Sequence, residues 1–246
     1  MNKSISLLSA LFCTFIWGTT FIAQDTGMDK IGPLTFNATR FFVGFLSIIP
    51  FALLIEKNKI SKEISNNKNL FFKLLFWVGL FLFLGTFLQQ AALLYTDVAN
   101  AAFFTIFYVP MVPIILFFIY SKSIHWSIWP SALFCVFGVY LLSDFSDATI
   151  RLGDGLVILC AVFWALHIIF IGNFAKYFNL PLFFGALQAL LVSFFSLIFA
   201  IFFETITIAN ILNESISIIY AGVLSGGIAF TLQIYAQKNI SPAPAG

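Results

Sequence analysis

Two apolar segments of this chain carry the same pair of functional groups at the same spacing, an indole followed three residues later by a polar side chain. Trp17 and Thr20 form the first pair, and Trp164 and His167 form the second. Residues three apart lie on one face of a helix, so each pair would offer one stacking surface and one hydrogen-bonding group. This chemistry suits a cavity that binds an organic molecule. Simple helix packing, with the indole N–H bonded locally, is the alternative explanation.

Arg40 is the charged residue placed deepest within an apolar segment, about seven residues after Pro33. An arginine at the centre of a membrane-spanning helix costs roughly 2.5–3.5 kcal/mol, so it should face a cavity or a partner. One interpretation is contact with a carboxylate or another anionic group of a substrate. The other is a structural arginine that reaches helix-end carbonyls or the outer headgroups. Both interpretations fit the sequence.

Other polar side chains within the apolar segments complete the set of residues predicted to contact a substrate. These are Gln89, Gln90, Asn100, Tyr108 and Gln233. Hydrogen bonding between helices is the alternative role for each of them. His167 could also carry a proton, because imidazole titrates near neutral pH. No acidic residue lies mid-span to join it in a relay, so a neutral, hydrogen-bonding histidine is the favoured interpretation.

The composition indicates a membrane protein. Of the 246 residues, 61% are hydrophobic and 9% are charged, whereas soluble domains carry about 25% charge. Several apolar stretches reach the length of about 18 residues or more that a helix needs to cross a ~30 Å hydrocarbon core. We therefore expect the chain to lie in a lipid bilayer. The net charge of +2 is small and scattered, which argues against nucleic acid as a partner.

Eight membrane-spanning helices are predicted, in an all-α polytopic membrane protein. They lie near residues 5–24, 33–55, 71–94, 98–120, 126–143, 154–174, 181–203 and 215–237. With the N-terminus in the cytoplasm, nine lysines flank that side, against Lys30 and Arg151 on the other. This distribution satisfies the positive-inside rule. Acidic residues, Asp144 and Asp147 among them, gather on the opposite side. The sequence thus predicts a cytoplasmic N-terminus and a multi-pass protein of the cell membrane.

An inverted repeat accounts for the paired motifs. Trp17 and Trp164 each follow a cysteine by four residues, and a Pro-Leu pair opens both the second and the seventh span. Five spans make one unit, and an odd number of spans turns the next unit upside down. We predict a first five-helix unit over residues 1–147 and a second, inverted unit over residues 148–246. The second unit holds three helices and the start of a fourth, so we expect two helices of a 5+5 arrangement to be absent.

Five segments of the chain carry a recognisable family pattern. They are Phe15-Ile16-Trp17-Gly18-Thr19-Thr20-Phe21, Pro33-Leu34-Thr35-Phe36-Asn37-Ala38-Thr39-Arg40, Gln90-Ala91-Ala92-Leu93-Leu94-Tyr95-Thr96, Val98-Ala99-Asn100-Ala101-Ala102 and Tyr108-Val109-Pro110-Met111. Their order and spacing resemble the drug/metabolite transporter superfamily, specifically its EamA-type ten-helix transporters. The resemblance implies two five-helix repeats around a central cavity that opens alternately to each side. The absent ninth and tenth helices depart from that pattern.

The predicted function is secondary transport or export of small organic metabolites, amino-acid-like or drug-like, by alternating access. A non-transporting or degenerate membrane fragment is the alternative. An intramembrane enzyme fits less well, because the sequence has no H-E-x-x-H motif, and Ser225 follows His167 without a Gly-x-Ser-Gly motif. We expect no catalytic group, no cofactor and no metal, since no cysteine spacing suggests a metal site. A homodimer is compatible with the sequence.

Overall fold

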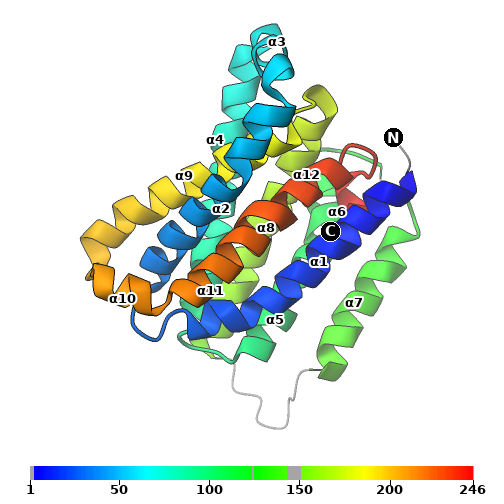
Figure 1. Ribbon diagram of the computed structural model, residues 1–246. Coiled ribbons are helices and arrows are strands. Elements are labelled where there is room, and N and C mark those ends of the chain that lie inside the picture. The colour runs from blue at the N-terminus through cyan, green and yellow to red at the C-terminus, as the bar shows by residue number, and fades with distance from the viewer. Residues whose placement is uncertain (1–2, 124, 143–150, 246) are drawn as a thin grey trace.

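The chain folds into helices because hydrocarbon offers no hydrogen-bonding partner to an open backbone, whereas a helix pairs its own N–H and C=O groups. A computed structural model describes residues 3–123, 125–142 and 151–245, and this part of the chain contains helices and no β-strand (Figure 1). The elements are α1 (Lys3–Thr26), α2 (Pro33–Ile55), α3 (Lys57–Asn66), α4 (Lys68–Ala92), α5 (Val98–Thr105), α6 (Tyr108–Phe118), α7 (Ile128–Leu142), α8 (Leu152–Tyr177), α9 (Pro181–Phe203), α10 (Ile208–Asn213), α11 (Ser215–Tyr220), the π-helix η2 (Ala221–Ala229), α12 (Phe230–Ala236) and α13 (Pro242–Ala245).

Seven of these units are long and apolar enough to cross a membrane, with α5 and α6 counted as one and α11, η2 and α12 counted as one. The fifth predicted span corresponds to α7, a shorter apolar helix of 15 residues. The predicted fold class, an all-α polytopic membrane protein, is confirmed. The fourth predicted span is interrupted between Thr105 and Tyr108. Pro110 then lies in the first turn of α6, where a missing N–H is tolerated.

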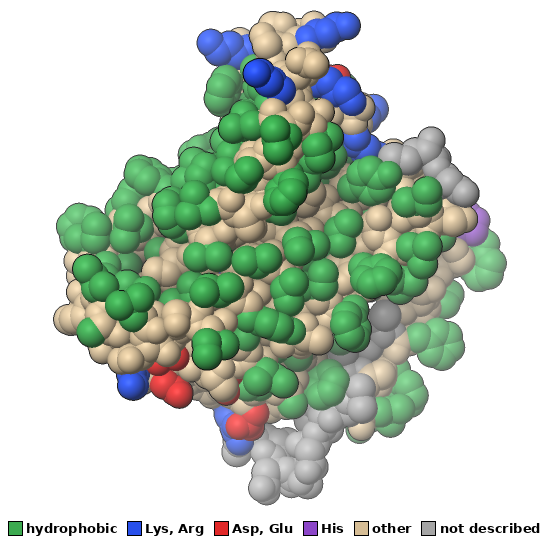
Figure 2. Space-filling model, in the orientation of Figure 1, with side chains coloured by type: hydrophobic (Ala, Val, Ile, Leu, Met, Phe, Trp, Pro, Cys, Tyr) green, Lys and Arg blue, Asp and Glu red, His purple; other side chains and the backbone are tan. Residues whose placement is uncertain are grey.

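Polar residues between the second and third predicted spans form a helix of their own, α3. Its lysines are exposed, while Ile60 and Ile64, one turn apart, pack against an apolar cluster that includes Phe71. Lys and Arg side chains gather around this end of the molecule, and Asp and Glu side chains lie near the opposite end (Figure 2). Which end faces the cytoplasm stays a prediction. Asp144, Asp147 and the expected repeat boundary at residue 147 lie outside the described residues.

Helices α2 and α9 form the central pair of the bundle and run in opposite directions, since the end of each lies at the start of the other. Around them, α4 packs against α8 and α9, while the η2–α12 segment packs against α1 and α2. The contacts of α4 with the second half thus mirror those of η2–α12 with the first half. An inverted repeat produces this arrangement.

Glycines bring η2 close to α2. A Cβ atom at Gly44 would lie 2.8 Å from the carbonyl carbon of Gly226, and one at Gly222 would lie 2.6 Å from the Arg40 carbonyl oxygen. Small residues permit this backbone approach in lipid, where helices associate through packing. The wide π-helical turn, a feature frequent at functional sites, therefore lies beside the turn of α2 that carries Arg40.

Candidate functional site

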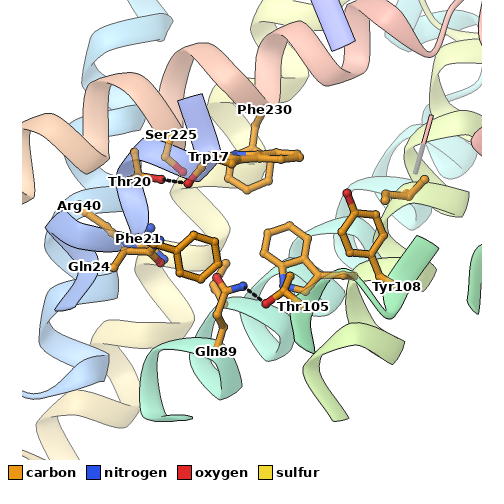
Figure 3. Close-up of a pocket in the computed structure, with 13 residues that line it drawn as sticks. Trp17, Thr20, Phe21, Gln24, Arg40, Gln89, Thr105, Tyr108, Ser225 and Phe230 are labelled. Carbon is orange, nitrogen blue, oxygen red and sulfur yellow. Dashed lines mark hydrogen bonds between the residues drawn. The ribbon is translucent and has the colours of Figure 1, made fainter. Parts of the chain in front are cut away.

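A cavity lies at the centre of the bundle, between helices of the two halves. It has a volume of about 50 Å³ for the centres of water-sized molecules. The residues that line it are Trp17, Thr20, Phe21, Gln24, Arg40, Thr86, Gln89, Thr105, Tyr108, Trp164, Ile168, Ser225 and Phe230 (Figure 3). Six of the ten residues predicted from the sequence to contact a substrate are in this set: Trp17, Thr20, Arg40, Gln89, Tyr108 and Trp164.

Three aromatic rings from three different helices form one wall of the cavity. The ring centroids of Trp17 and Trp164 lie 5.9 Å apart, and Phe230 lies 5.1 Å from Trp17. Phe230 also stacks on Trp164 at 5.8 Å with an interplanar angle of 4°. Such contacts contribute about 0.5–1.5 kcal/mol each beyond the area they bury. The two tryptophans of the repeated motif therefore meet at the seam between the halves, where they fix the shape of the wall.

Arg40 is buried on the cavity wall, with 2% of its surface exposed. Its Nε donates a hydrogen bond to Asn37 Oδ1 at 2.8 Å, and its guanidinium carbon lies 4.7 Å from the Phe41 ring centroid and 5.5 Å from that of Phe36. Among the described residues, Arg40 makes no ion pair and no hydrogen bond to a helix-end carbonyl. The buried guanidinium therefore retains donors for a further partner. Contact with a substrate stays a prediction.

The other polar side chains on the wall are only partly satisfied. Gln89 Nε2 donates to Thr105 Oγ1 at 2.9 Å, and Thr20 Oγ1 donates to the Trp17 carbonyl oxygen at 2.9 Å. The Nε1 donor of Trp17 and the Oε1 acceptor of Gln24 are buried without a partner. An unpaired buried group costs about 1–3 kcal/mol. The cavity of about 50 Å³ has room for about three to five waters at roughly 10–15 Å³ each, so water or ligand atoms can complete these bonds.

The cavity is polarised along its length. Arg40 and Gln24 lie together at one end, and Tyr108 lies at the other (Figure 3). Of the lining residues that the structure describes, Arg40 alone carries a charge, and none is acidic. Because a charge acts over a longer range in a low-dielectric interior than in water, this one guanidinium makes the cavity attractive to anions.

Two of the predicted contact residues do not line the cavity. Gln90 Nε2 donates to the backbone carbonyl of Gln24 at 2.6 Å, which ties α4 to the end of α1. Asn100 is half-buried in α5 and is not among the lining residues. Successive residues of a helix point about 100° apart, so Gln89 and Gln90 cannot face the same wall.

Two further predicted residues lie close to the cavity but behind its wall. His167 is fully buried, packs edge-on against Trp164 and Phe230, and places Nε2 3.2 Å from Gln188 Oε1. Gln233 lines a smaller neighbouring cavity between α1, α6 and α12. His167 is thus a neighbour of the aromatic wall, and its role in binding stays a prediction.

Seven lining residues were not in the predicted set. They are Phe21, Gln24, Thr86, Thr105, Ile168, Ser225 and Phe230. Gln24 had a usable signal, because it continues the helical face of Trp17 and Thr20 seven residues on. Phe230 had none, since it is one of 34 phenylalanines in the chain.

Hydrogen bonds between the two halves close the bundle at both ends. Thr96 Oγ1, after α4, donates to Asp154 Oδ1 at the start of α8 at 2.6 Å. At the opposite end, Asn239 Nδ2, after α12, donates to Ser6 Oγ near the start of α1 at 2.8 Å. The two contacts join equivalent elements of the two halves. No cluster of His, Cys, Asp and Glu side chains suited to a metal occurs in the described part of the chain.

Comparison with known proteins identifies the family. The model of the EamA-like transporter family matches residues 4–144 and, a second time, residues 151–246. The chain belongs to the EamA-like transporter family. An uncharacterized transporter of Archaeoglobus fulgidus is 29% identical to this EamA-like chain over 235 residues, 94% of this chain and 70% of the relative. The uncharacterized transporter YoaV of Bacillus subtilis is 22% identical over 251 residues, 97% of this chain and 82% of that protein.

A solved protein crystal structure shows the same fold as this EamA-like chain. It superposes with a TM-score of 0.71 at 17% identity and covers 97% of this chain and 80% of that one. Family membership and the seven apolar units together make this EamA-like protein a multi-pass protein of the cell membrane. The family transports small molecules across membranes.

Proposed function

We propose that this EamA-like protein is a secondary transporter of small organic carboxylates with an apolar or aromatic body, amino-acid-like molecules among them. The observation that supports this proposal most directly is the buried guanidinium of Arg40, on a cavity wall that carries no acidic residue among those described. A carboxylate would supply the missing acceptors and the missing countercharge together. Hydrogen bonds of this charged type contribute about 1.5–3 kcal/mol.

The aromatic wall supports an apolar body on the substrate. Trp17, Trp164 and Phe230 present adjacent ring surfaces next to Arg40 and Gln24. A substrate held by its carboxylate at the Arg40 end would place its side chain along these rings. The free Gln24 Oε1 acceptor could receive an N–H or O–H donor beside the carboxylate. A purely cationic compound would find no acidic partner among the described residues that line this wall.

The small size of the cavity and the hydrogen bonds at both ends of the bundle support transport by alternating access. About 50 Å³ holds a few waters and no amino acid, so helices must separate before a substrate enters. The Thr96–Asp154 contact closes one end, and the Asn239–Ser6 contact closes the other. Opening one contact while the other stays closed would expose the cavity to one side of the membrane at a time.

The orientation proposed from the lysines places α3 in the cytoplasm. A cysteine-free variant with one new cysteine at Lys62 in α3, or at Ala209 in α10, can be labelled in intact cells with a membrane-impermeant maleimide. We expect labelling of the Ala209→Cys protein only, because both positions are exposed and lie at opposite ends of the bundle. Labelling of the Lys62→Cys protein alone would reverse the orientation.

Counterflow in proteoliposomes tests the function. Proteoliposomes that contain the protein are loaded with an unlabelled compound, and their uptake of the same compound in labelled form is followed. The compounds are phenylalanine, leucine, their 2-oxo acids and their amides. We expect exchange of compounds with a free carboxylate and little exchange of the amides, because only a carboxylate neutralises Arg40. The 2-oxo acids show whether the amino group contributes to binding.

Matched variants connect the activity to the cavity. Arg40→Gln should abolish the preference for carboxylates, whereas Arg151→Gln, which removes a surface arginine paired with Asp97, should leave it unchanged. Exchange of amides and carboxylates at equal rates by the wild-type protein would contradict the proposed substrate class. No exchange of any compound by a folded protein would contradict the proposed function itself.

A further inference from the structure

Helices α2 and α9 share a feature that the central cavity does not use. Each has 23 residues, begins with proline and is followed directly by a glutamate, Glu56 after α2 and Glu204 after α9. Because the helices are antiparallel, each glutamate lies beside the first turn of the other helix. The first N–H groups of a helix have no partner within it, and the positive end of the helix dipole favours a carboxylate there.

The hydrogen bonds are reciprocal between the two halves. Glu204 accepts the backbone N–H groups of Leu34 and Thr35, each at 2.8 Å, and the Thr35 hydroxyl at 2.7 Å. Glu56 accepts the backbone N–H groups of Leu182 at 3.1 Å and Phe183 at 2.8 Å. In both cases the two carboxyl oxygens accept separate bonds, as an ionised carboxylate does.

The surroundings of both carboxylates are shaped for these contacts. Glu56 is buried, with 5% of its surface exposed, and Glu204 is half-buried. Gly32, the residue before α2, leaves room for Glu204, since a Cβ atom there would lie 2.2 Å from the Glu204 Cδ. Neither helix start has a capping bond from the side chain of its own N-cap residue. The other half of the chain therefore supplies each cap.

We propose that Glu204 and Glu56 are positioning residues that fix the register of α2 against α9. Arg40 is the eighth residue of α2, and Gln188, the partner of His167, is the eighth residue of α9. Each carboxylate thus anchors the helix start about two turns from a polar side chain at the centre of the bundle. Glu204 sets the place of Arg40, and Glu56 sets the place of Gln188.

Backbone hydrogen exchange tests this crossed relation in the full-length protein in nanodiscs. Glu56→Gln should speed exchange at Leu182 and Phe183, in the other half, and leave Leu34 and Thr35 unchanged. Glu204→Gln should do the reverse. Glutamine has the size of glutamate but one acceptor oxygen, so loss of a charged hydrogen bond should speed exchange about tenfold, and alanine should speed it more. Glu63→Gln is the matched control, because Glu63 accepts the Asn179 N–H outside α9.

A second measurement reports on Arg40 itself. The chain has two arginines, so in an Arg151→Lys background Arg40 is the only arginine that the reagent phenylglyoxal can modify, and the reagent reaches it when the helices separate. Glu204→Gln should change the rate of this modification several-fold, and Glu56→Gln should not. A purely space-filling role predicts no effect of glutamine at either position. Three outcomes of the hydrogen-exchange measurement would overturn the proposal: a faster rate only at sequence neighbours of the mutated residue, an equal increase at both helix starts, or the wild-type rate at both. An unchanged rate of Arg40 modification in the Glu204→Gln protein would also overturn it. If the alanine variants do not fold, the hydrogen-exchange and modification rates of the glutamine variants test the proposal on their own.

Discussion

Replacement of Arg40 by methionine separates its contribution to stability from its contribution to transport. Methionine keeps an unbranched side chain that ends where the Nε of arginine lies, and it removes the charge. Arg40 is fully enclosed, bonded to Asn37 and placed over the rings of Phe36 and Phe41. The substitution therefore deletes a small number of identifiable interactions.

The opposing contributions to stability nearly cancel. Placing arginine at the centre of a span costs roughly 2.5–3.5 kcal/mol. The hydrogen bond from the charged Nε to Asn37 contributes about 1.5–3 kcal/mol, and the cation–π contacts contribute about 0.5–2 kcal/mol. We expect the free energy of unfolding of the Arg40→Met protein to lie within about 2.5 kcal/mol of the wild-type value. Loss of the carboxylate contact, at about 1.5–3 kcal/mol, should lower transport efficiency about 10- to 150-fold.

Two assays on the same preparations measure these quantities. Unfolding in mixed micelles of increasing SDS content gives the free energy, and proteoliposome exchange of a labelled carboxylate gives the transport efficiency. Arg151→Met provides the control, since its ion pair with Asp97 is exposed and should contribute about 0–1 kcal/mol.

The reasoning fails in two distinguishable ways. A loss of more than about 3 kcal/mol in stability is the signature of a buried charge separated from a strong partner, and it would make Arg40 a structural residue. Wild-type transport by a stable Arg40→Met protein would remove Arg40 from the binding site.

Three more expectations follow from the packing. Gly44→Ala should destabilise the protein by about 1–3 kcal/mol, as measured by SDS unfolding, because its Cβ would lie 2.9 Å from the Gly222 carbonyl oxygen; a wild-type value would mean that α2 and η2 separate freely. Thr96→Val should loosen the contact with Asp154 and speed maleimide labelling of a cysteine placed in the cavity, and unchanged labelling would exclude this contact as a gate. Burial raises the pKa of Glu56 above its ordinary value of 4.5, so the folded state binds the proton more tightly than the unfolded state. The stabilisation this proton provides is present below pH 4.5 and is lost as the pH rises through the raised pKa. The melting temperature in detergent should therefore fall over that window, and Glu56→Gln should flatten the dependence; an equal slope in both proteins would contradict it.

The sequence predicted best those features that depend on local chemistry. The second and seventh predicted spans, 33–55 and 181–203, match α2 and α9 residue for residue. Proline favours the first position of a helix, and a charged residue limits how far an apolar helix extends in lipid. The proline at the start and the glutamate after the end of each helix therefore predicted both of its boundaries. α3 was missed as a helix, because its stability comes from Ile60 and Ile64 packing against another element.

The cavity was predicted only in part, because helix rotation decides which side chain faces it. Repetition of the Trp17 and Trp164 motifs indicated that both indoles belong to one place, and their ring centroids lie 5.9 Å apart. Gln90 could not be separated from Gln89, since both are polar and adjacent in a uniformly apolar helix. With apolar residues on all sides, such a helix has no strong amphipathic signal to fix its rotation.

The sequence by itself determined that this chain spans the membrane repeatedly, and it predicted that the second half repeats the first in the opposite direction, because hydrophobicity, charge and motif order are properties of the chain. The tertiary structure decided which groups meet. The approach of η2 to Arg40, the packing of Phe230 against two tryptophans, and the capping of each central helix by a glutamate of the other half all join residues far apart in sequence. Such contacts depend on how rigid helices pack, and no local pattern of residues encodes that packing.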